Sequence, residues 1–363
     1  MSGASGTDGG GARALPVTPD WVIRVIETSA DQAVVFVTEQ LSHKDEALAA
    51  SDPLSRIKAR RAIYEHLDFL IATLATDELQ LFEAYIAWVA DVMSARGLAT
   101  ETLSTSLRLL MAFFERRLDP VAFAPVSAVL SWGLAVVEGL PTGQRPAPSP
   151  LMPSPLPYVE QLTRTLIEGD IGLTRALIKR AQFEGSSYLH IATRLFQPSL
   201  YDVGRLWQEN KISVAQEHLA STLTQTLLSQ LFIRADFAIA NGRKALLACV
   251  AGNTHALGLR IVSDAFELSG WTVQFLGADV PGDALLLQVD SWRPDVVCLS
   301  AAFVQQLPEL RRVITEIRGT FLTHRPTIIV GGLATNEVKN IWRWLGADEW
   351  FPDAEKAIAA TGH

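Results

Sequence analysis

The sequence predicts an α + α/β protein, in which an N-terminal helical domain and a four-helix bundle precede an α/β domain with a parallel sheet. Three observations predict this class. Apolar residues recur at helical spacing up to about residue 240, short apolar runs alternate with helical patterns from residue 243 onward, and seven prolines crowd residues 141–157. The length of 363 residues suits two or three packed domains.

The N-terminal helical domain is placed at residues 19–140, as a sensor or interaction domain, and we expect residues 1–18 to form a disordered tail. Apolar residues spaced by three and four predict its helices, and Gly97 and Pro120 supply stops between them. The predicted helices are Ile57–Leu74, Glu78–Ala95, Thr100–Leu118 and Val121–Val137. We assign the aromatic residues of this domain to its core.

Residues 141–157 are interpreted as a semi-rigid, Pro-rich linker, and residues 158–242 as a helical-bundle cap. The helices predicted for the cap are Tyr158–Glu168, Ile171–Phe183, Ser187–Glu209 and Ser213–Ala240. We expect the third of these to bend at Pro198. Ser213 and Gln216 have the spacing of a capping box at the start of the fourth.

Residues 243–363 alternate between strand and helix patterns, which predicts a mostly parallel sheet with right-handed crossovers. The predicted strands are Ala245–Ala251, Thr272–Leu276, Val296–Ser300, Thr327–Val330 and Glu349–Phe351. The predicted helices are Leu257–Ser269, Pro281–Trp292, Val304–Thr320 and Thr335–Leu345. The arrangement resembles the flavodoxin-like Rossmann fold.

The composition excludes some classes of partner. A net charge of −8 and a pI near 5.4 argue against nucleic acid as a direct partner, since phosphate binding needs a basic face. The basic run Arg56–Arg61 is interpreted as a solvated helix face. We find no apolar stretch of the roughly 18 residues that span a bilayer and no signal peptide, so we expect no membrane partner and a cytoplasmic location. Cys249 and Cys298 fall in predicted core strands, as buried thiols in a reducing compartment do.

Polar and small residues follow three of the predicted strands, at the edge where open parallel sheets bind ligands. They are Asn253, His255 and Gly258 after the first strand, Ser300 at the end of the third, and Gly331 and Gly332 after the fourth. Because the carboxyl ends of parallel strands meet at one edge, these residues can converge on one ligand. A neutral imidazole at His255 could coordinate a metal, and no dinucleotide fingerprint follows the first strand.

This pattern resembles the cobalamin-binding domain family over the whole of residues 243–363. The resemblance implies that His255 is the lower axial ligand of cobalt, and that the displaced cobalamin tail threads a slot beside Ser300 and the two glycines. Two positions depart from the family pattern: Asn253 stands where an acid is usual, and two alanines follow Ser300 in place of a larger residue. We expect the amide oxygen of Asn253 to orient the imidazole N–H without the charge of a carboxylate.

Trp207 ends one predicted helix of the cap, and Glu217 and His218 lie in the first two turns of the next, so the three are expected near one end of the bundle. The segment Leu206–His218 closely resembles light-sensing cobalamin proteins, which bind adenosylcobalamin. The resemblance implies that Trp207 caps the adenosyl group and that Glu217 orients or contacts adenosine. It also implies that His218 is a cobalt ligand after light breaks the upper cobalt–carbon bond.

The chain is also similar to the photocobilin-like subset of these photoreceptors, which pairs the cobalamin module with a noncovalent bilin such as biliverdin. The absence of cysteine before Cys249 fits noncovalent binding. His43, His66 and His190 are interpreted as helix-surface histidines, and none is assigned as a bilin ligand.

Three functions are open at this point. The first, which we favour, is a cobalamin-binding photoreceptor without intrinsic catalysis, in which photolysis changes domain or subunit packing and the output passes through a homo-oligomer, such as a dimer, or a signalling partner. The second is a corrinoid methyl-carrier protein of a methyltransferase system, which must expose the upper face that Trp207, Glu217 and His218 would cover. The third is a cobalamin-binding or storage module that does not switch.

Overall fold

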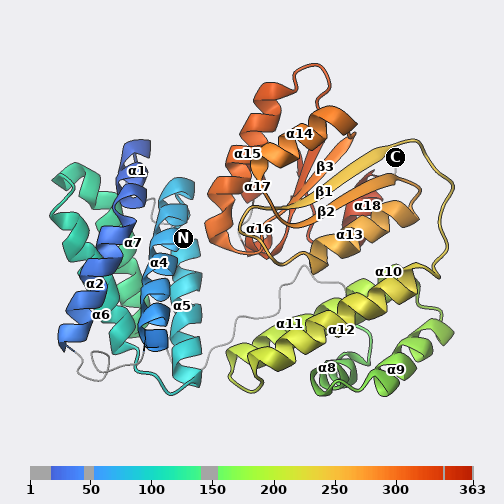
Figure 1. The fold of residues 1–363 in the computed structure, drawn as a ribbon, viewed down its shortest axis with the longest axis horizontal. Coiled ribbons are helices and arrows are strands. Elements are labelled where there is room, and N and C mark those ends of the chain that lie inside the picture. The colour runs from blue at the N-terminus through green and yellow to red at the C-terminus, as the bar shows by residue number, and fades with distance from the viewer. Residues whose placement is uncertain (1–17, 45–52, 140–153, 338–339, 362–363) are drawn as a thin grey trace, which may run out of the picture. The chain divides into compact units, whose positions relative to one another are not determined.

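The computed structural model describes residues 18–44, 53–139, 154–337 and 340–361, and the chain divides into two compact units. The first comprises residues 1–90 and 99–140, and the second comprises residues 91–98 and 141–363. Figure 1 shows helices in the first unit, and a sheet with flanking helices and a separate layer of helices in the second. The predicted tail and most of the predicted linker lie outside the described residues.

The N-terminal region is helical, as the spacing of its apolar residues predicts. Its helices are α1 Asp20–Thr28, α2 Ala30–Lys44, α4 Pro53–Thr76, α5 Leu79–Ala95, α6 Glu101–Glu115 and α7 Pro120–Gly139. The four predicted helices are present with ends displaced by at most four residues, and α1 and α2 precede them. Pro120 is the first residue of α7, where a missing N–H costs nothing.

His66 corrects one expectation for this region. It was expected on a helix surface, but its side chain is buried, and Nδ1 lies 2.6 Å from the hydroxyl of Tyr85. Phe69 stacks on the ring of Tyr85 at 3.7 Å. Burial lowers the pKa of His66 to about 4, so this histidine is a neutral core residue at pH 7.

Helix α7 corrects another expectation, that no apolar stretch is long enough to span a bilayer. It has 20 residues with a mean hydropathy of 1.8, so its length and composition suffice for a membrane crossing. One such helix is weak support for a span, because a core helix passes the same test. α7 packs against α4 and α6, and a Cβ added at Gly133 would lie 2.6 Å from the Phe82 ring. That close approach explains the glycine in mid-helix.

The cap contains the predicted helices, with an irregularity in the third. Its elements are α8 Val159–Glu168, α9 Ile171–Phe183, α10 Tyr188–Ile191, a π-helical turn Ala192–Phe196, α11 Gln197–Gln208 and α12 Val214–Phe232. The irregularity therefore precedes Pro198, which lies in the first turn of α11. The capping box is confirmed: Gln216 N donates to Ser213 Oγ at 3.2 Å, and Ser213 N donates to Gln216 Oε1 at 3.0 Å.

Helix α12 ends at Phe232, eight residues before the predicted end at Ala240. Beyond it, the backbone N–H of Ala238 donates to the carbonyl oxygen of Leu268 at 2.9 Å. The segment after α12 thus satisfies its backbone against the α/β domain instead of continuing the helix.

The α/β domain has five parallel strands in the order β2-β1-β3-β4-β5, which is the predicted flavodoxin-like arrangement (Figure 1). The strands are β1 Lys244–Val250, β2 Thr272–Val280, β3 Val296–Ser300, β4 Thr327–Gly331 and β5 Glu349–Trp350. The helices are α13 Leu257–Leu268, α14 Gly282–Trp292, α15 Leu307–Thr320, α16 Leu333–Glu337, α17 Ile341–Leu345 and α18 Ala354–Thr361. The helix predicted at Thr335–Leu345 is therefore two short helices, and a 3-10 turn, Val304–Gln306, precedes α15.

The strand order places the topological switch point of the sheet between β1 and β3, where open α/β sheets bind ligands. The chain passes from β1 to β2 on one side and returns to β3 on the other, so the loops after β1 and β3 lead away from each other. These are the loops predicted to carry the site. Cys249 and Cys298 lie buried in the same two strands, as predicted, and burial raises the pKa of Cys249 to about 11.

Candidate functional site

Asn253 ties the loop after β1 to the end of β3. Its side chain is buried, Nδ2 donates to the carbonyl oxygen of Ser300 at 2.9 Å, and Oδ1 accepts the backbone N–H of His255 at 3.0 Å. The amide oxygen therefore holds the backbone of His255, whereas we expected it to orient the imidazole N–H. This is a correction, and its cause is that the turn after β1 leaves a backbone donor within reach.

The imidazole of His255 is exposed at this sheet edge. Within the described parts of the chain, no group hydrogen-bonds its ring nitrogens, so either nitrogen is free to meet a ligand. Its ring contact is with Phe303, whose ring centroid lies 5.0 Å away with the two planes at 83°. Sequence reasoning missed Phe303; its signal was an aromatic residue three positions after Ser300, on the neighbouring loop.

Gln306 is a second residue that sequence reasoning missed. Its side chain is buried, and Oε1 accepts the backbone N–H groups of Ala302 at 2.8 Å and Phe303 at 3.1 Å. Its Nε2 donates to the carbonyl oxygen of Gly252 at 2.9 Å. One amide therefore joins the loop that carries Phe303 to the loop that carries His255.

The predicted slot beside Ser300 has one strict steric requirement. Gly332 has φ +99°, and a Cβ there would lie 2.2 Å from the carbonyl oxygen of Ala301 and 2.8 Å from Ser300 Oγ. A Cβ at Gly331 would meet only ordinary contact, and one at Gly258 would meet nothing within 4 Å. Of the three glycines, the fold itself requires Gly332.

Trp207 lies in the last turn of α11, and Glu217 and His218 lie in the first turns of α12. His218 Nδ1 is hydrogen-bonded to Glu217 Oε2, and Ser221 donates to Glu217 Oε1 at 2.8 Å. The His218 side chain is 74% exposed. In the described ranges, no hydrogen bond or ring contact joins these three residues to the α/β domain, so the structure does not bring them onto His255.

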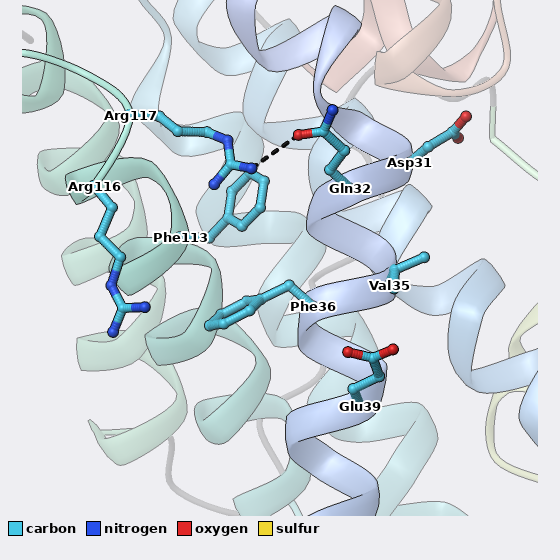
Figure 2. A pocket seen from close by; sticks show the side chains of 8 residues that line it. All are labelled: Asp31, Gln32, Val35, Phe36, Glu39, Phe113, Arg116 and Arg117. Atoms are coloured by element: carbon cyan, nitrogen blue, oxygen red, sulfur yellow. Dashed lines mark hydrogen bonds between the residues drawn. The ribbon is translucent and has the colours of Figure 1, made fainter.

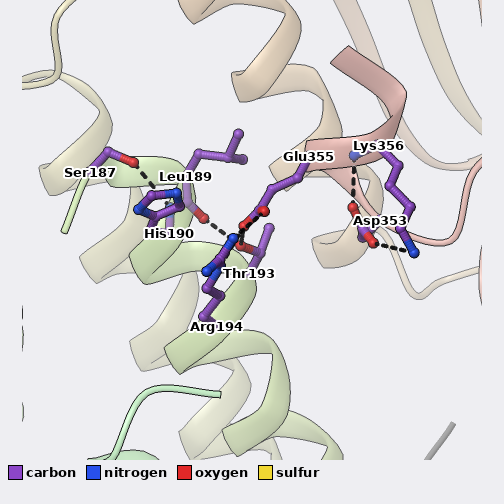
Figure 3. A network of polar contacts seen from close by, with 8 residues as sticks. All are labelled: Ser187, Leu189, His190, Thr193, Arg194, Asp353, Glu355 and Lys356. Carbon is purple, nitrogen blue, oxygen red and sulfur yellow. Dashed lines mark hydrogen bonds and ion pairs between the residues drawn. The ribbon is translucent and has the colours of Figure 1, made fainter. Parts of the chain in front are cut away.

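The cap is attached to the α/β domain near α10. Arg194 donates twice to Glu355 of α18, at 3.0 and 2.7 Å, and Thr193 donates to the same carboxylate at 2.6 Å (Figure 3). Asp264 of α13 accepts hydrogen bonds from Tyr188 and from Arg260. We call these two groups the anchor of the cap.

A separate surface pocket of about 420 Å³ lies between α2 and α6 of the first unit (Figure 2). Its floor includes Phe36 and Phe113, whose ring centroids are 5.6 Å apart. Arg117 stacks over Phe113 at 3.8 Å and donates to Gln32 at 2.8 Å, and Arg116 lies 5.9 Å from the Phe36 ring. Sequence reasoning did not find this pocket.

Comparison with known proteins identifies two B12 binding domain matches in the second unit. Residues 158–231 and residues 243–361 each match a B12 binding domain family. The chain carries a B12-binding module. The residues at the sheet edge fit this cofactor in one respect: the loop after β1 presents an exposed imidazole whose ring nitrogens no described residue hydrogen-bonds.

The relatives include two repressors and a corrinoid protein. The chain is 34% identical over 149 residues to the HTH-type transcriptional repressor CarA of Myxococcus xanthus, covering 41% of this chain and 50% of that protein. It is 30% identical over 159 residues to CarH of the same organism, covering 42% and 52%. Dimethylamine corrinoid protein 3 of Methanosarcina mazei is 28% identical over 112 residues, covering 30% and 64%. The chain thus spans about half the length of the repressors it matches.

Among solved structures, the monomethylamine corrinoid protein of Methanosarcina barkeri matches with 18% identity and a TM-score of 0.47, covering 55% of this chain and 95% of that one. The predicted resemblance to the cobalamin-binding photoreceptor family is confirmed by the domain matches and the CarA and CarH relatives. The expectation that nucleic acid is not a direct partner stays a prediction, since both repressors are of the HTH type.

Proposed function

We propose that the protein is a cobalamin-dependent photoreceptor without catalysis of its own. The observation that carries this is an exposed imidazole with free ring nitrogens, His255, at the crevice of a B12-binding module. Relatives that are transcriptional repressors support a regulatory role over an enzymatic one. Bound adenosylcobalamin would supply a cobalt–carbon bond that light breaks.

The residues of the chain divide the work as follows. His255 would hold the cobalt of the bound cobalamin, on a loop that Asn253 and Gln306 hold in place. Ser300 and Gly332 line the slot for the cobalamin tail. Trp207 and Glu217 would lie against the adenosyl group, and His218 would be the residue that binds cobalt once light has broken the cobalt–carbon bond. Its exposure leaves its ring free to move, because only Glu217 hydrogen-bonds it among the described residues.

In this proposal, photolysis changes the packing of the domains or subunits. The change is passed to a second copy of the chain or to a signalling partner in the cytoplasm. The finer proposal adds a noncovalent bilin, such as biliverdin, as a second chromophore. We place it at the pocket between α2 and α6, because Arg116 and Arg117 could pair with its carboxylates and Phe36 and Phe113 offer ring contacts. His66 is not offered as its partner, since Tyr85 already binds this buried ring.

The test is reconstitution of the full chain with adenosylcobalamin in the dark, followed by absorption spectra and gel filtration before and after illumination. We expect corrinoid bands to elute with the protein, the spectrum to change with light, and the elution volume to shift. A His255→Ala variant should lose most of the bound corrinoid. Protein that stays colourless, or that is unchanged by light, contradicts the proposal. Biliverdin added to the same protein should give a red-absorbing band that the Arg116→Gln, Arg117→Gln double variant weakens.

A corrinoid methyl carrier is the second candidate, and the match to dimethylamine corrinoid protein 3 favours it. A carrier must expose the upper face of the corrin to a methyl acceptor. Transfer of the methyl group from methylcobalamin-loaded protein to a thiol, at the same rate in wild type and Trp207→Ala, would support this candidate over the photoreceptor.

A further inference from the structure

Among the described residues, no side chain or carbonyl hydrogen-bonds the imidazole of His255. Metal-binding histidines usually donate their second ring N–H to a carboxylate, a carbonyl or water, which fixes the ring orientation. Here the Asn253 amide is taken up by the His255 backbone N–H and by the Ser300 carbonyl. Among the described residues, the contact made by the imidazole ring is the edge-to-face contact with Phe303.

The backbone of Phe303 is held in place by the side chain of Gln306. The Gln306 side chain accepts its backbone N–H and reaches across to the carbonyl oxygen of Gly252 in the His255 loop. Because Gln306 is buried and uses both ends of its amide, the spacing of the two loops is set by hydrogen bonds from this side chain to the backbone. The ring of Phe303 is nevertheless 41% exposed, so burial of the ring does not by itself explain a phenylalanine at this position.

We propose that Phe303 is a positioning residue for His255, holding the imidazole edge-on so that a ring nitrogen points into the crevice. An aromatic wall restricts rotation of the imidazole without occupying either nitrogen, which a hydrogen-bonding partner would do. Gln306 acts through Phe303 by holding its backbone. This inference rests on the proposed role of His255 as the lower ligand of cobalt.

The experiment compares Phe303→Ala, Phe303→Tyr and His255→Ala in the full chain. Leu287→Ala is the matched control, because Leu287 is an exposed apolar residue of the same domain, on α14. The first measurement needs no cofactor. The ring-proton NMR signals of His255 should move in Phe303→Ala toward those of a histidine without a neighbouring aromatic ring. They should keep their wild-type positions in Phe303→Tyr. The second is the affinity for cobalamin. The third is the 15N hyperfine splitting in the EPR spectrum of cob(II)alamin loaded into 15N-labelled protein, which distinguishes a protein imidazole from the 14N base of the cobalamin tail.

For Phe303→Ala we expect an affinity about 2- to 12-fold weaker, the range that one aromatic pair supplies, together with a smaller fraction of nitrogen-coupled cobalt. In Phe303→Tyr and in Leu287→Ala, the affinity for cobalamin and the fraction of nitrogen-coupled cobalt should both stay at their wild-type values. Unchanged NMR signals, or weaker binding with full nitrogen coupling, overturn the proposal, the latter because Phe303 would then contact the corrin directly. Full nitrogen coupling in His255→Ala would instead overturn the proposed lower ligand.

Discussion

The two ends of the cap differ in how they are held. At the α10 end, Arg194 and Thr193 bind Glu355, and Tyr188 binds Asp264, so two helices of the α/β domain are joined to the cap. At the other end, where α11 turns into α12, His218 is exposed. There the described residues offer no hydrogen bond from Trp207 or His218 to the sheet domain.

Because of this difference, we expect residues at one end of the cap to stabilise the fold and residues at the other end to act on the cofactor. Groups of the anchor are buried or doubly hydrogen-bonded, so their loss should cost free energy of unfolding. At the open end, the His218 side chain is exposed and among the described residues is hydrogen-bonded by Glu217 alone, so its loss should alter the cofactor and leave the fold intact. Each variant below is expected to affect one end and not the other.

The largest effect is expected for Asp264→Ala at the anchor. The carboxylate is almost fully buried and accepts hydrogen bonds from Tyr188 and Arg260, which would both lose their acceptor. We expect a loss of about 3 kcal/mol in the free energy of unfolding, measured by urea denaturation. Asp202→Ala is the control, because its pair with Arg205 is exposed and should contribute less than about 1 kcal/mol. Equal losses in the two variants would contradict the distinction.

Ser213→Ala should cost about 1 kcal/mol, because it removes the capping box that starts α12. Glu217 and His218 lie in the turns that this cap orders, so their local order should fall as well. Amide hydrogen exchange over residues 214–218 checks this, with Ser229→Ala, an exposed serine later in α12, as the control. Unchanged exchange there would mean that packing, and not the cap, orders this end.

Glu355→Gln should cost about 1 kcal/mol at neutral pH, since both partners of the ion pair are partly exposed. Hydrogen bonds from Arg194 lower the pKa of Glu355 below its ordinary value of 4.5. The carboxylate therefore stabilises the fold above about pH 4.5, and this contribution is lost as pH falls through the lowered pKa. Unfolding free energies of wild type and variant should converge on acidification; a constant gap would point to lost packing instead.

The smallest effect on stability is expected for His218→Ala, within about 0.5 kcal/mol, because the side chain is exposed. Its effect should appear in the spectrum of the illuminated, cobalamin-loaded protein, where the upper histidine ligand would be missing. A variant with the wild-type light spectrum would remove His218 from the proposed mechanism. A variant that unfolds would remove the distinction between the two ends.

Elements whose contacts are local in sequence were predictable. Strand β3 has the predicted bounds, Val296–Ser300, because a fully buried parallel strand reads as a continuous apolar run. The capping box of Ser213 and the sheet-edge position of His255 followed from short-range patterns in the same way. The parallel sheet followed from the alternation of strand and helix.

Features set by distant partners were not predictable. The end of α12 depends on a backbone bond from Ala238 to Leu268, 30 residues away. The burial of His66 depends on a hydrogen bond to Tyr85 on the next helix. Gln306 joins two loops through an amide that is 54 residues from its acceptor in Gly252, and no spacing in the sequence marks it.

The π-helical turn Ala192–Phe196 affects which face of the helix each later residue of the cap lies on. Such a turn accommodates one residue more than an α-helix does, and each residue adds about 100° of rotation around the axis. Removing one residue from this turn would therefore leave a regular α-helix in which Tyr188 and Trp207 keep nearly their present faces, whereas the same deletion within α11 would turn Trp207 by about 100°. The π-helical turn is thus the point in this helix where the chain can lose a residue without reorienting the indole that we propose as a cover for the cofactor.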